Sequence, residues 1–194
     1  MRAILISIRP QWVEKILNGE KTIEIRKTKP NIKLPCKVYI YCTKGKPTLQ
    51  YFYNWRNYKP ISEHSTWADG RTINAGEYGN GKIVAEFTLK NIVKFDIESI
   101  LFLGKEKEFM QKSCLGGLSL RKYLGNKIGY AWHVEDLKIY DKPRELSEFI
   151  KTCPYDDSPC KVCEYYSDYS GECRNIITRP PQSWRYVEKN NERD

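Results

Sequence analysis

The sequence lacks any run of about 18 apolar residues, the length that a membrane-spanning helix requires. Its opening stretch, MRAILISIRP, lacks an apolar region followed by small residues and so does not resemble a secretory signal. It has no internal repeat. The seven cysteines are an odd number, which argues against a fully paired disulfide framework. These absences exclude membrane-spanning and disulfide-stapled secreted proteins, and we expect a soluble, cytoplasmic protein.

What is present is a basic chain of ordinary composition. Its 194 residues fit a single domain over residues 1–194 with a real hydrophobic core. The net charge is +9, and residues 1–50 hold eleven Lys and Arg against three Glu, a local net of +8. Such an excess can mark a face that attracts phosphates or a lysine-rich solvated surface, and charge alone leaves both interpretations open.

The N-terminal third shows clear secondary-structure patterns. Residues 3–8 are a short apolar run of strand length. Pro10 suits the first position of a helix, an apolar stripe follows, and Gly19 can supply its left-handed C-terminal turn. Residues 21–27 alternate like a half-buried strand, with Ile23 and Ile25 on one face and polar residues on the other. A third strand is expected over 36–44.

The remaining chain is less regular. We expect a long aromatic-rich loop insertion over 46–80, strands over 81–89 and 128–140, and a short helix over 117–125 capped by Ser119. A last strand begins near Trp184. Short strands and helices without regular strand–helix alternation favour an α+β fold, a small mixed β-barrel flanked by short helices, over a doubly wound sheet.

The segment GEKTIEIR, residues 19–26, concentrates charge on one strand face. Lys21, Glu24 and Arg26 would gather two cations and one anion within a few ångströms. The cations can hold a phosphate or a carbonyl, while the carboxylate accepts from an amide or acts as a base. The alternative is a solvated strand face with an ordinary Glu–Arg pair.

This segment resembles the signature of the ASCH domain, a branch of the PUA-like superfamily. Gly19, Lys21, Glu24 and Arg26 fill the pattern G-x-K-x-x-E-x-R, directly after an N-terminal strand and helix. The stretches SIRPQWVEKILNGE, GKIVAEF, YAWHVEDLKIY and RPPQSWRYV extend the resemblance over most of the chain. It covers neither residues 46–80 nor the cysteine-rich stretch 153–173. The similarity is greatest to small stand-alone ASCH proteins of bacteria and phages.

The resemblance implies a β-barrel with a cleft beside the first helix, where the motif side chains converge. Members are associated with RNA, modified nucleosides or coactivator roles, and some are amidohydrolases of acylated cytidine or ribonucleases. Where the amidohydrolases carry Thr, this chain carries Glu24. By position, the cleft would also hold nine further nucleotide-binding residues: Ser7, Arg9, Tyr41, Thr43, Trp132, His133, Gln182, Ser183 and Trp184. Trp and Tyr can stack on bases, and Gln can read a base edge.

Several of these residues have a simpler interpretation. Trp132 can belong to the core, and His133 can be an ordinary surface histidine. The RPPQS stretch can be a stiff turn that only starts the last strand.

Four cysteines cluster near the C-terminus as C-x6-C-x2-C-x9-C: Cys153, Cys160, Cys163 and Cys173. The C-x2-C pair suits two thiolates on one tetrahedral Zn²⁺, and the insert has few apolar residues to fold without metal. We expect a structural zinc. Free thiols, opportunistic disulfides or an iron–sulfur cluster are the alternatives.

Three functions follow from these features. The first is an RNA, single-stranded nucleic acid or modified-nucleoside binding module centred on the motif cleft. The second is a hydrolase of a modified nucleoside, or a ribonuclease, with Lys21 and Glu24 as catalytic acid and base. The third is a protein-interaction adaptor that uses the 46–80 loop and the insert at 153–173.

Overall fold

The computed structural model describes residues 2–45, 79–102, 106–151 and 176–189, together with four short strands between residues 45 and 79. These four are β4 (Tyr53–Asn54), β5 (Lys59–Pro60), β6 (His64–Thr66) and β7 (Thr72–Asn74), which pair as β4–β5 and β6–β7. The rest of the predicted 46–80 insertion, up to residue 78, and the cysteine-rich insert at 153–173 lie outside the described residues.

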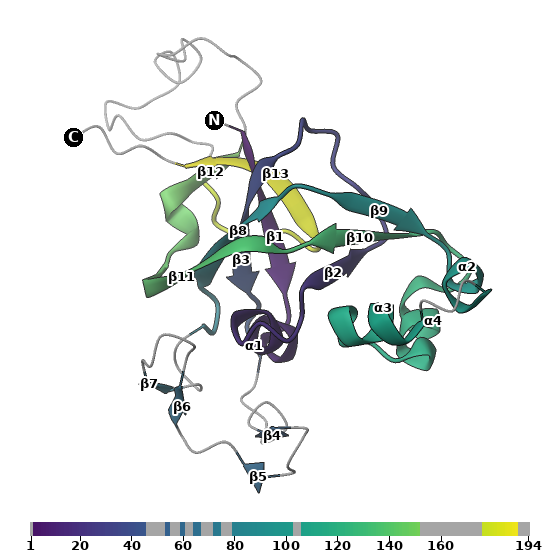
Figure 1. Cartoon of the computed structure of the whole chain (residues 1–194). Helices are drawn as coiled ribbons and strands as arrows, with labels where there is room; N and C mark the ends of the chain where they lie inside the picture. Colours follow the sequence, from purple (N-terminus) through teal and green to yellow (C-terminus); the bar gives the residue numbers. More distant parts are fainter. Residues whose placement is uncertain are drawn as a thin grey trace, which may run out of the picture.

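A six-stranded sheet forms the centre of the fold, in the order β11-β8-β3-β1-β13-β12 (Figure 1). Its strands are β1 (Ala3–Ile8), β3 (Cys36–Cys42), β8 (Ile83–Leu89), β11 (Glu135–Arg144), β12 (Phe149–Lys151) and β13 (Trp184–Lys189). Strand β1 is central and runs parallel to β3 and antiparallel to β13.

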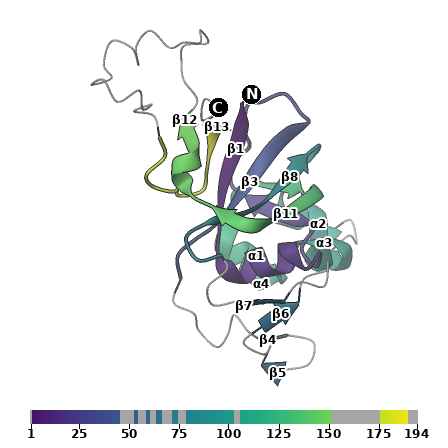
Figure 2. The same ribbon diagram turned by 90° about the vertical axis from the view of Figure 1, so that its left-hand side faces the viewer.

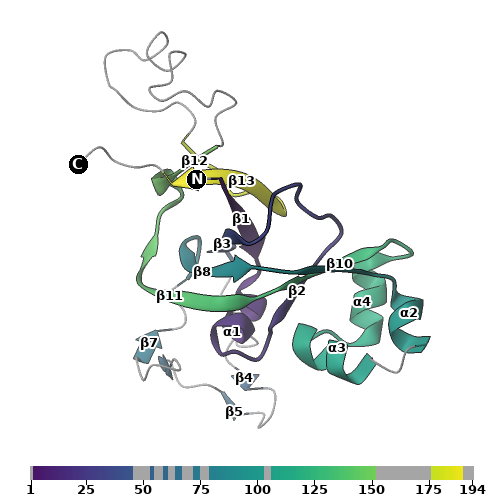
Figure 3. The ribbon, with the colours of Figure 1, turned by 45° about the horizontal axis from the view of Figure 1, so that its top comes forward.

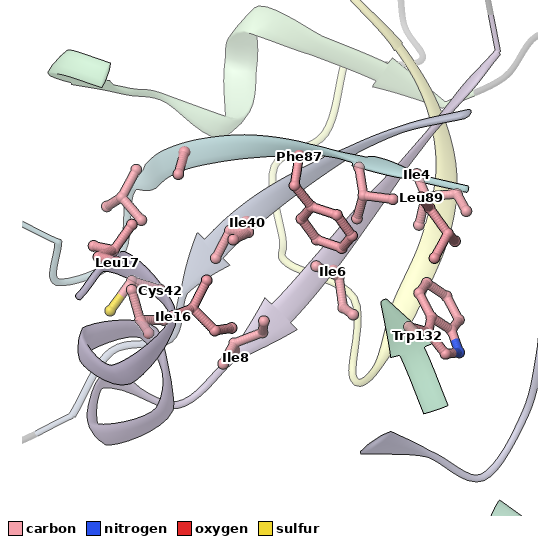
Figure 4. Close-up of a cluster of buried hydrophobic side chains, with 14 of the residues drawn as sticks. Ile4, Ile6, Ile8, Ile16, Leu17, Ile40, Cys42, Phe87, Leu89 and Trp132 are labelled. Atoms are coloured by element: carbon pink, nitrogen blue, oxygen red, sulfur yellow. The ribbon is translucent and has the colours of Figure 1, made fainter. Parts of the chain in front are cut away.

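The apolar run of β1 is continuous because both faces of this strand are covered. Ile4, Ile6 and Ile8 belong to one core cluster, whereas Ala3 and Leu5 belong to another on the opposite face. Successive side chains of a strand point to opposite faces, so an uninterrupted apolar sequence fits this central position. Figure 4 shows the first cluster, in which Phe87 and the Ile residues of β1 lie together.

A three-stranded sheet, β2-β10-β9, lies beside the first. Its strands are β2 (Ile23–Arg26), β10 (Gly129–His133) and β9 (Ile92–Phe95). Strands β8 and β11 of the large sheet continue along the chain as β9 and β10 of the small one (Figure 1). The fold is therefore mixed α+β. Among the described strands no ladder joins the edge strands β11 and β12, so the predicted barrel closure is not observed.

Helix α1 (Pro10–Leu17) follows β1 and lies at the end of the sheet toward which β1 and β3 run (Figures 1 and 2). Its apolar stripe is buried as predicted: Ile16 and Leu17 lie in the core near Cys42 (Figure 4). After the helix, Gly19 takes the predicted positive φ, 72°.

Three helices gather beside the small sheet: α2 (Ile97–Phe102), α3 (Glu106–Ser113) and α4 (Gly117–Leu124) (Figure 3). Their apolar residues share a third core cluster with Ile23 and Ile25 of β2. The predicted cap of α4 was wrong: the N-cap is Gly116, and Ser119 lies within the helix. None of the described helices is long and apolar enough to cross a lipid bilayer.

Candidate functional site

Strand β2 separates its residues between two faces as predicted, but both faces are covered. Ile23 and Ile25 enter the third core cluster, whereas Glu24 and Arg26 face the opposite side. Lys21, Glu24 and Arg26 are only 2%, 5% and 7% exposed. The pattern predicted a half-buried strand, and the tertiary structure has buried its charged face as well.

The three charged side chains form a buried triad. Glu24 Oε1 accepts a hydrogen bond from Arg26 Nη1, and Glu24 Oε2 lies 3.5 Å from Lys21 Nζ. Lys21 Nζ also donates to the carbonyl of Ser113 at 2.5 Å. Ser113 is the last residue of α3, where the unpaired carbonyls of a helix end favour a cation. The ammonium is therefore fixed between the carboxylate and the helix end.

Arg26 links the two sheets. Its Nη2 donates to the carbonyl of Ser7, at the end of β1, at 2.8 Å, and its Nη1 donates to the carbonyl of Ile25 at 2.9 Å. The guanidinium thus holds β2 against the end of the central strand. The rigid guanidinium is held by its bonds to these two carbonyls, so its bond to Glu24 also fixes the orientation of that carboxylate.

Two buried polar atoms of the triad make no hydrogen bond within the described residues: Glu24 Oε2 and Arg26 Nε. Lys21 Nζ has three N–H donors, of which one bonds the carbonyl of Ser113 and another is directed to Glu24 in the ion pair. Buried polar atoms are normally satisfied, so these atoms require an explanation, such as an ordered water or a ligand that bonds them.

The burial of Lys21 lowers the pKa of its ammonium, and the attraction of Glu24 offsets this only in part. The Coulombic attraction of Glu24 is thus smaller than the desolvation that opposes it. A buried charge whose pKa is shifted by desolvation is typical of functional sites, and structural ion pairs show such shifts as well.

A cavity of about 650 Å³ opens onto the triad, and we call it the triad pocket. Eight of the residues predicted for the cleft line it: Ser7, Arg9, Lys21, Glu24, Arg26, Thr43, Gln182 and Ser183. They come from β1, the segment before β2, β2 itself, the end of β3 and the approach to β13. The structure therefore brings together residues that are far apart in the sequence.

The other four predicted residues lie elsewhere. Trp132 is fully buried in the first core cluster (Figure 4), as the cross-strand neighbour of Glu24. His133 follows on the opposite face of β10. Trp184 packs 5.8 Å from Trp132 between ring centroids and donates from Nε1 to Thr28 Oγ1. Tyr41 lines a different cavity.

Five lining residues with polar or aromatic side chains were not predicted: Gln11, Trp12, Ser119, Lys122 and Tyr123. The first two belong to α1, where the ring of Trp12 lies 5.4 Å from Lys21 Nζ. The other three lie on α4, and Tyr123 is 39% exposed. The amphipathic pattern of α4 could have identified its polar face, but nothing in the sequence places that face beside β2.

The predicted zinc ligands, Cys153, Cys160, Cys163 and Cys173, lie outside the described residues. Within the described part of the chain, no group of three or more His, Cys, Asp or Glu side chains could hold a metal ion. Cys36, Cys42 and Cys114 are free thiols. Burial raises the pKa of Cys36 to about 11 and that of Cys42 to about 12, so both remain protonated at neutral pH.

Comparisons with known proteins show which solved structures have a similar fold. No family model and no curated protein matches the sequence. Among solved structures, the crystal structure of ASCH from Zymomonas mobilis matches with a TM-score of 0.53 at 17% identity, covering 96% of this chain and 88% of that one. Two mutant structures of the same protein match with the same TM-score at 16% identity, covering 97% of this chain and 91% and 89% of theirs. The chain therefore has the fold of the ASCH domain structures.

Proposed function

We propose that the triad pocket binds a nucleotide or modified nucleoside, and that the chain is an RNA- or nucleoside-binding module. The observation that carries this proposal is the buried Lys21–Glu24–Arg26 triad, which lines a cavity of about 650 Å³ with an acceptor and donors left over. Cavities of roughly 300–1,000 Å³ hold small ligands. The ASCH-like fold, whose family resemblance implies RNA or modified nucleosides, supports the same assignment.

The chemistry of the lining fits a base with a phosphate nearby. Glu24 Oε2 can accept from an exocyclic amino group, and Lys21 can donate to a ring nitrogen or carbonyl. Arg9 and Lys122 add two exposed cations, so the four cations of the lining outnumber its one carboxylate. This excess favours an anionic ligand.

Two aromatic rings supply stacking surfaces. Trp12 lies on α1 and Tyr123 on α4, and both line the triad pocket. Base–aromatic stacking contributes about 1–3 kcal/mol per base and tolerates any sequence. Lys27 Nζ lies 5.1 Å from the ring centroid of Tyr123, which adds positive charge at that side.

Binding can be measured by titrating nucleosides, nucleoside 5′-monophosphates and short single-stranded RNA against the intrinsic tryptophan fluorescence. The exposed positions are the best to change, because Lys122→Ala and Tyr123→Ala should leave the core intact. We expect Tyr123→Ala to weaken binding by about 5- to 150-fold, the equivalent of about 1–3 kcal/mol.

Lys151→Ala is the matched control, since Lys151 is an exposed cation on β12 that does not line the pocket. It should bind like the wild type. Equal affinities for the wild type, Lys122→Ala and Tyr123→Ala would show that the triad pocket does not bind the nucleotide.

A second candidate function is hydrolysis of an acylated cytidine or of RNA. The lowered pKa of Lys21 favours it, because an amine that gives up its proton more readily can act as a base beside Glu24. Release of cytidine from N4-acetylcytidine, or cleavage of an RNA oligonucleotide, would be followed by chromatography. Turnover that Glu24→Gln abolishes in protein that thermal unfolding shows to be folded would support this candidate. Binding without turnover in the wild type would support the first function only.

A further inference from the structure

A second cavity, of about 550 Å³, lies next to the triad pocket. Thr43, which follows β3, lines both cavities. We call this second cavity the second pocket. Its other lining residues are Tyr41, Lys44, Gly81, the segment 145–147, Ile177, Thr178 and Pro180. Its volume is close to that of the triad pocket, so each can hold a group of similar size.

The segment that approaches β13 also borders both cavities. Thr178 and Pro180 line the second pocket, whereas Gln182 and Ser183 line the triad pocket. Ser7 fixes this segment, because its Oγ donates to the carbonyl of Pro181 at 2.6 Å and its backbone N–H donates to the carbonyl of Ser183 at 2.9 Å. The two cavities therefore lie along one segment that hydrogen bonds hold in place, and Thr43 borders both of them at their junction.

The second pocket combines apolar surface with hydroxyl groups. Leu146, Ile177 and Pro180 supply the apolar part, and Ser147 and Thr178 are exposed hydroxyls. Bases extracted from a stack are held between apolar or aromatic side chains while hydroxyls bond their edges. The lining thus fits a nucleobase without requiring a charge on it.

The charges around the second pocket leave a cation beside the junction. The carboxylate of Glu145 is paired with Lys82. Lys44, the residue after Thr43, is exposed, and its side chain lies across Gly81, where a Cβ would come within 2.8 Å of Lys44 Cε. Arg9 is an exposed cation in the lining of the triad pocket, as Lys44 is in that of the second pocket. One exposed cation in each lining suits a phosphate that bridges the two pockets.

We propose that the second pocket binds the nucleotide adjacent to the one in the triad pocket, so that the ligand is a single RNA strand of at least two nucleotides. The phosphodiester between them would lie at Thr43, close to Lys44. This inference rests on the proposed function of the triad pocket, and it narrows the ligand from a free nucleoside to an oligonucleotide.

The test compares mononucleotides with dinucleotides in the wild type and two variants. Ser147→Trp fills the second pocket from an exposed position, and Lys44→Ala removes the cation beside the junction. Lys151→Ala again serves as the control for charge, and thermal unfolding confirms that every variant is folded. Dissociation constants are measured for 5′-mononucleotides, for ribo- and deoxyribo-dinucleotides and for a tetranucleotide, at several salt concentrations.

We expect the wild type to bind ribodinucleotides at least ~10-fold more tightly than mononucleotides, since the second base binds intramolecularly. Ser147→Trp should abolish this gain and leave mononucleotide binding within about twofold of the wild type. Lys44→Ala should reduce the salt slope of oligonucleotide binding by about 0.7.

Four results would count against the inference. A dinucleotide that binds no more tightly than a mononucleotide, or a gain that survives in Ser147→Trp, would refute the second subsite alone. A wild type that binds no mononucleotide would refute the function proposed for the triad pocket, and the second subsite with it. Equal or tighter binding of the deoxyribo-dinucleotides would refute RNA as the strand.

Discussion

The buried triad makes an asymmetric prediction about stability. Lys21, Glu24 and Arg26 place two cations and one carboxylate in a region where their side chains are at most 9% exposed. Glu24→Gln keeps the shape of the side chain but leaves two buried cations without their counter-ion. Breaking a buried ion pair costs about 3–5 kcal/mol, so we expect the free energy of unfolding to fall by that amount.

Lys21→Met should behave differently. It removes the surplus cation and leaves Glu24 paired with Arg26, and the methionine chain has nearly the length of lysine. Desolvation is the largest influence on the pKa of Lys21, so the loss of its charge removes more cost than attraction. We expect a change of stability below about 1 kcal/mol in either direction, because the lost bond to Ser113 offsets the relief.

Equilibrium unfolding in urea at pH 7, with tryptophan fluorescence as the signal, measures both variants. For Glu24→Gln the midpoint of thermal unfolding should fall by roughly 6–20 °C, from about 2–4 °C per kcal/mol at this chain length. Glu98→Gln is the control, since its pair with Arg121 is exposed and such pairs contribute about 0–1 kcal/mol. If Glu24→Gln and Glu98→Gln cost the same, or if Lys21→Met costs as much as Glu24→Gln, the reasoning is refuted.

Three further predictions concern pH, packing and metal. The pKa of Lys21 in the folded protein lies below its usual 10.5, so the unfolded chain binds more protons at pH values between the two. The free energy of unfolding should therefore rise with pH across that window. Lys21→Met should lack this rise, which urea unfolding measured from about pH 7 to 10 would detect. Gly129→Ala should cost about 1–3 kcal/mol in the same assay, since its Cβ would lie 2.5 Å from Phe95 Cζ and 2.8 Å from Leu124 Cδ1; full stability would show that this contact relaxes freely. Elemental analysis of protein purified without added zinc should find about one zinc per chain from the insert at 153–173, and a folded protein without metal would contradict that proposal.

The sequence predicted the elements whose residues reflect local rules. The unbroken apolar run at 3–8 became the central strand β1, the apolar stripe after Pro10 became α1, and the alternation around Ile23 and Ile25 became β2. Each of these patterns is set by the period of the element and by which of its faces is buried. The motif residues could be grouped for the same reason, because Glu24 and Arg26 lie on one strand and Lys21 precedes it by two residues.

Longer-range features could not be predicted. No element was assigned over residues 92–113, where the structure has β9, α2 and α3, because short elements with mixed polarity carry weak periodicity. Nothing in the sequence indicates that Lys122 and Tyr123 line a pocket, because only the tertiary structure sets α4 beside β2. The burial of Glu24 and Arg26 was missed on the same ground, since alternation alone predicts that the polar face meets water.

Hydrogen bonds connect the triad to the segment that borders both pockets. Arg26 bonds the carbonyl of Ser7, and the hydroxyl of Ser7 bonds the carbonyl of Pro181, so one continuous chain of contacts joins β2 to the segment that separates the cavities. A ligand that engages Glu24 Oε2 therefore acts on a group whose other oxygen is fixed to this chain. Rigid support of this kind reduces the entropy lost on binding, because the segment that borders both pockets is already ordered before the RNA binds. A free nucleoside would contact only the part of this segment that lines one pocket, whereas two linked nucleotides would contact the parts that line both.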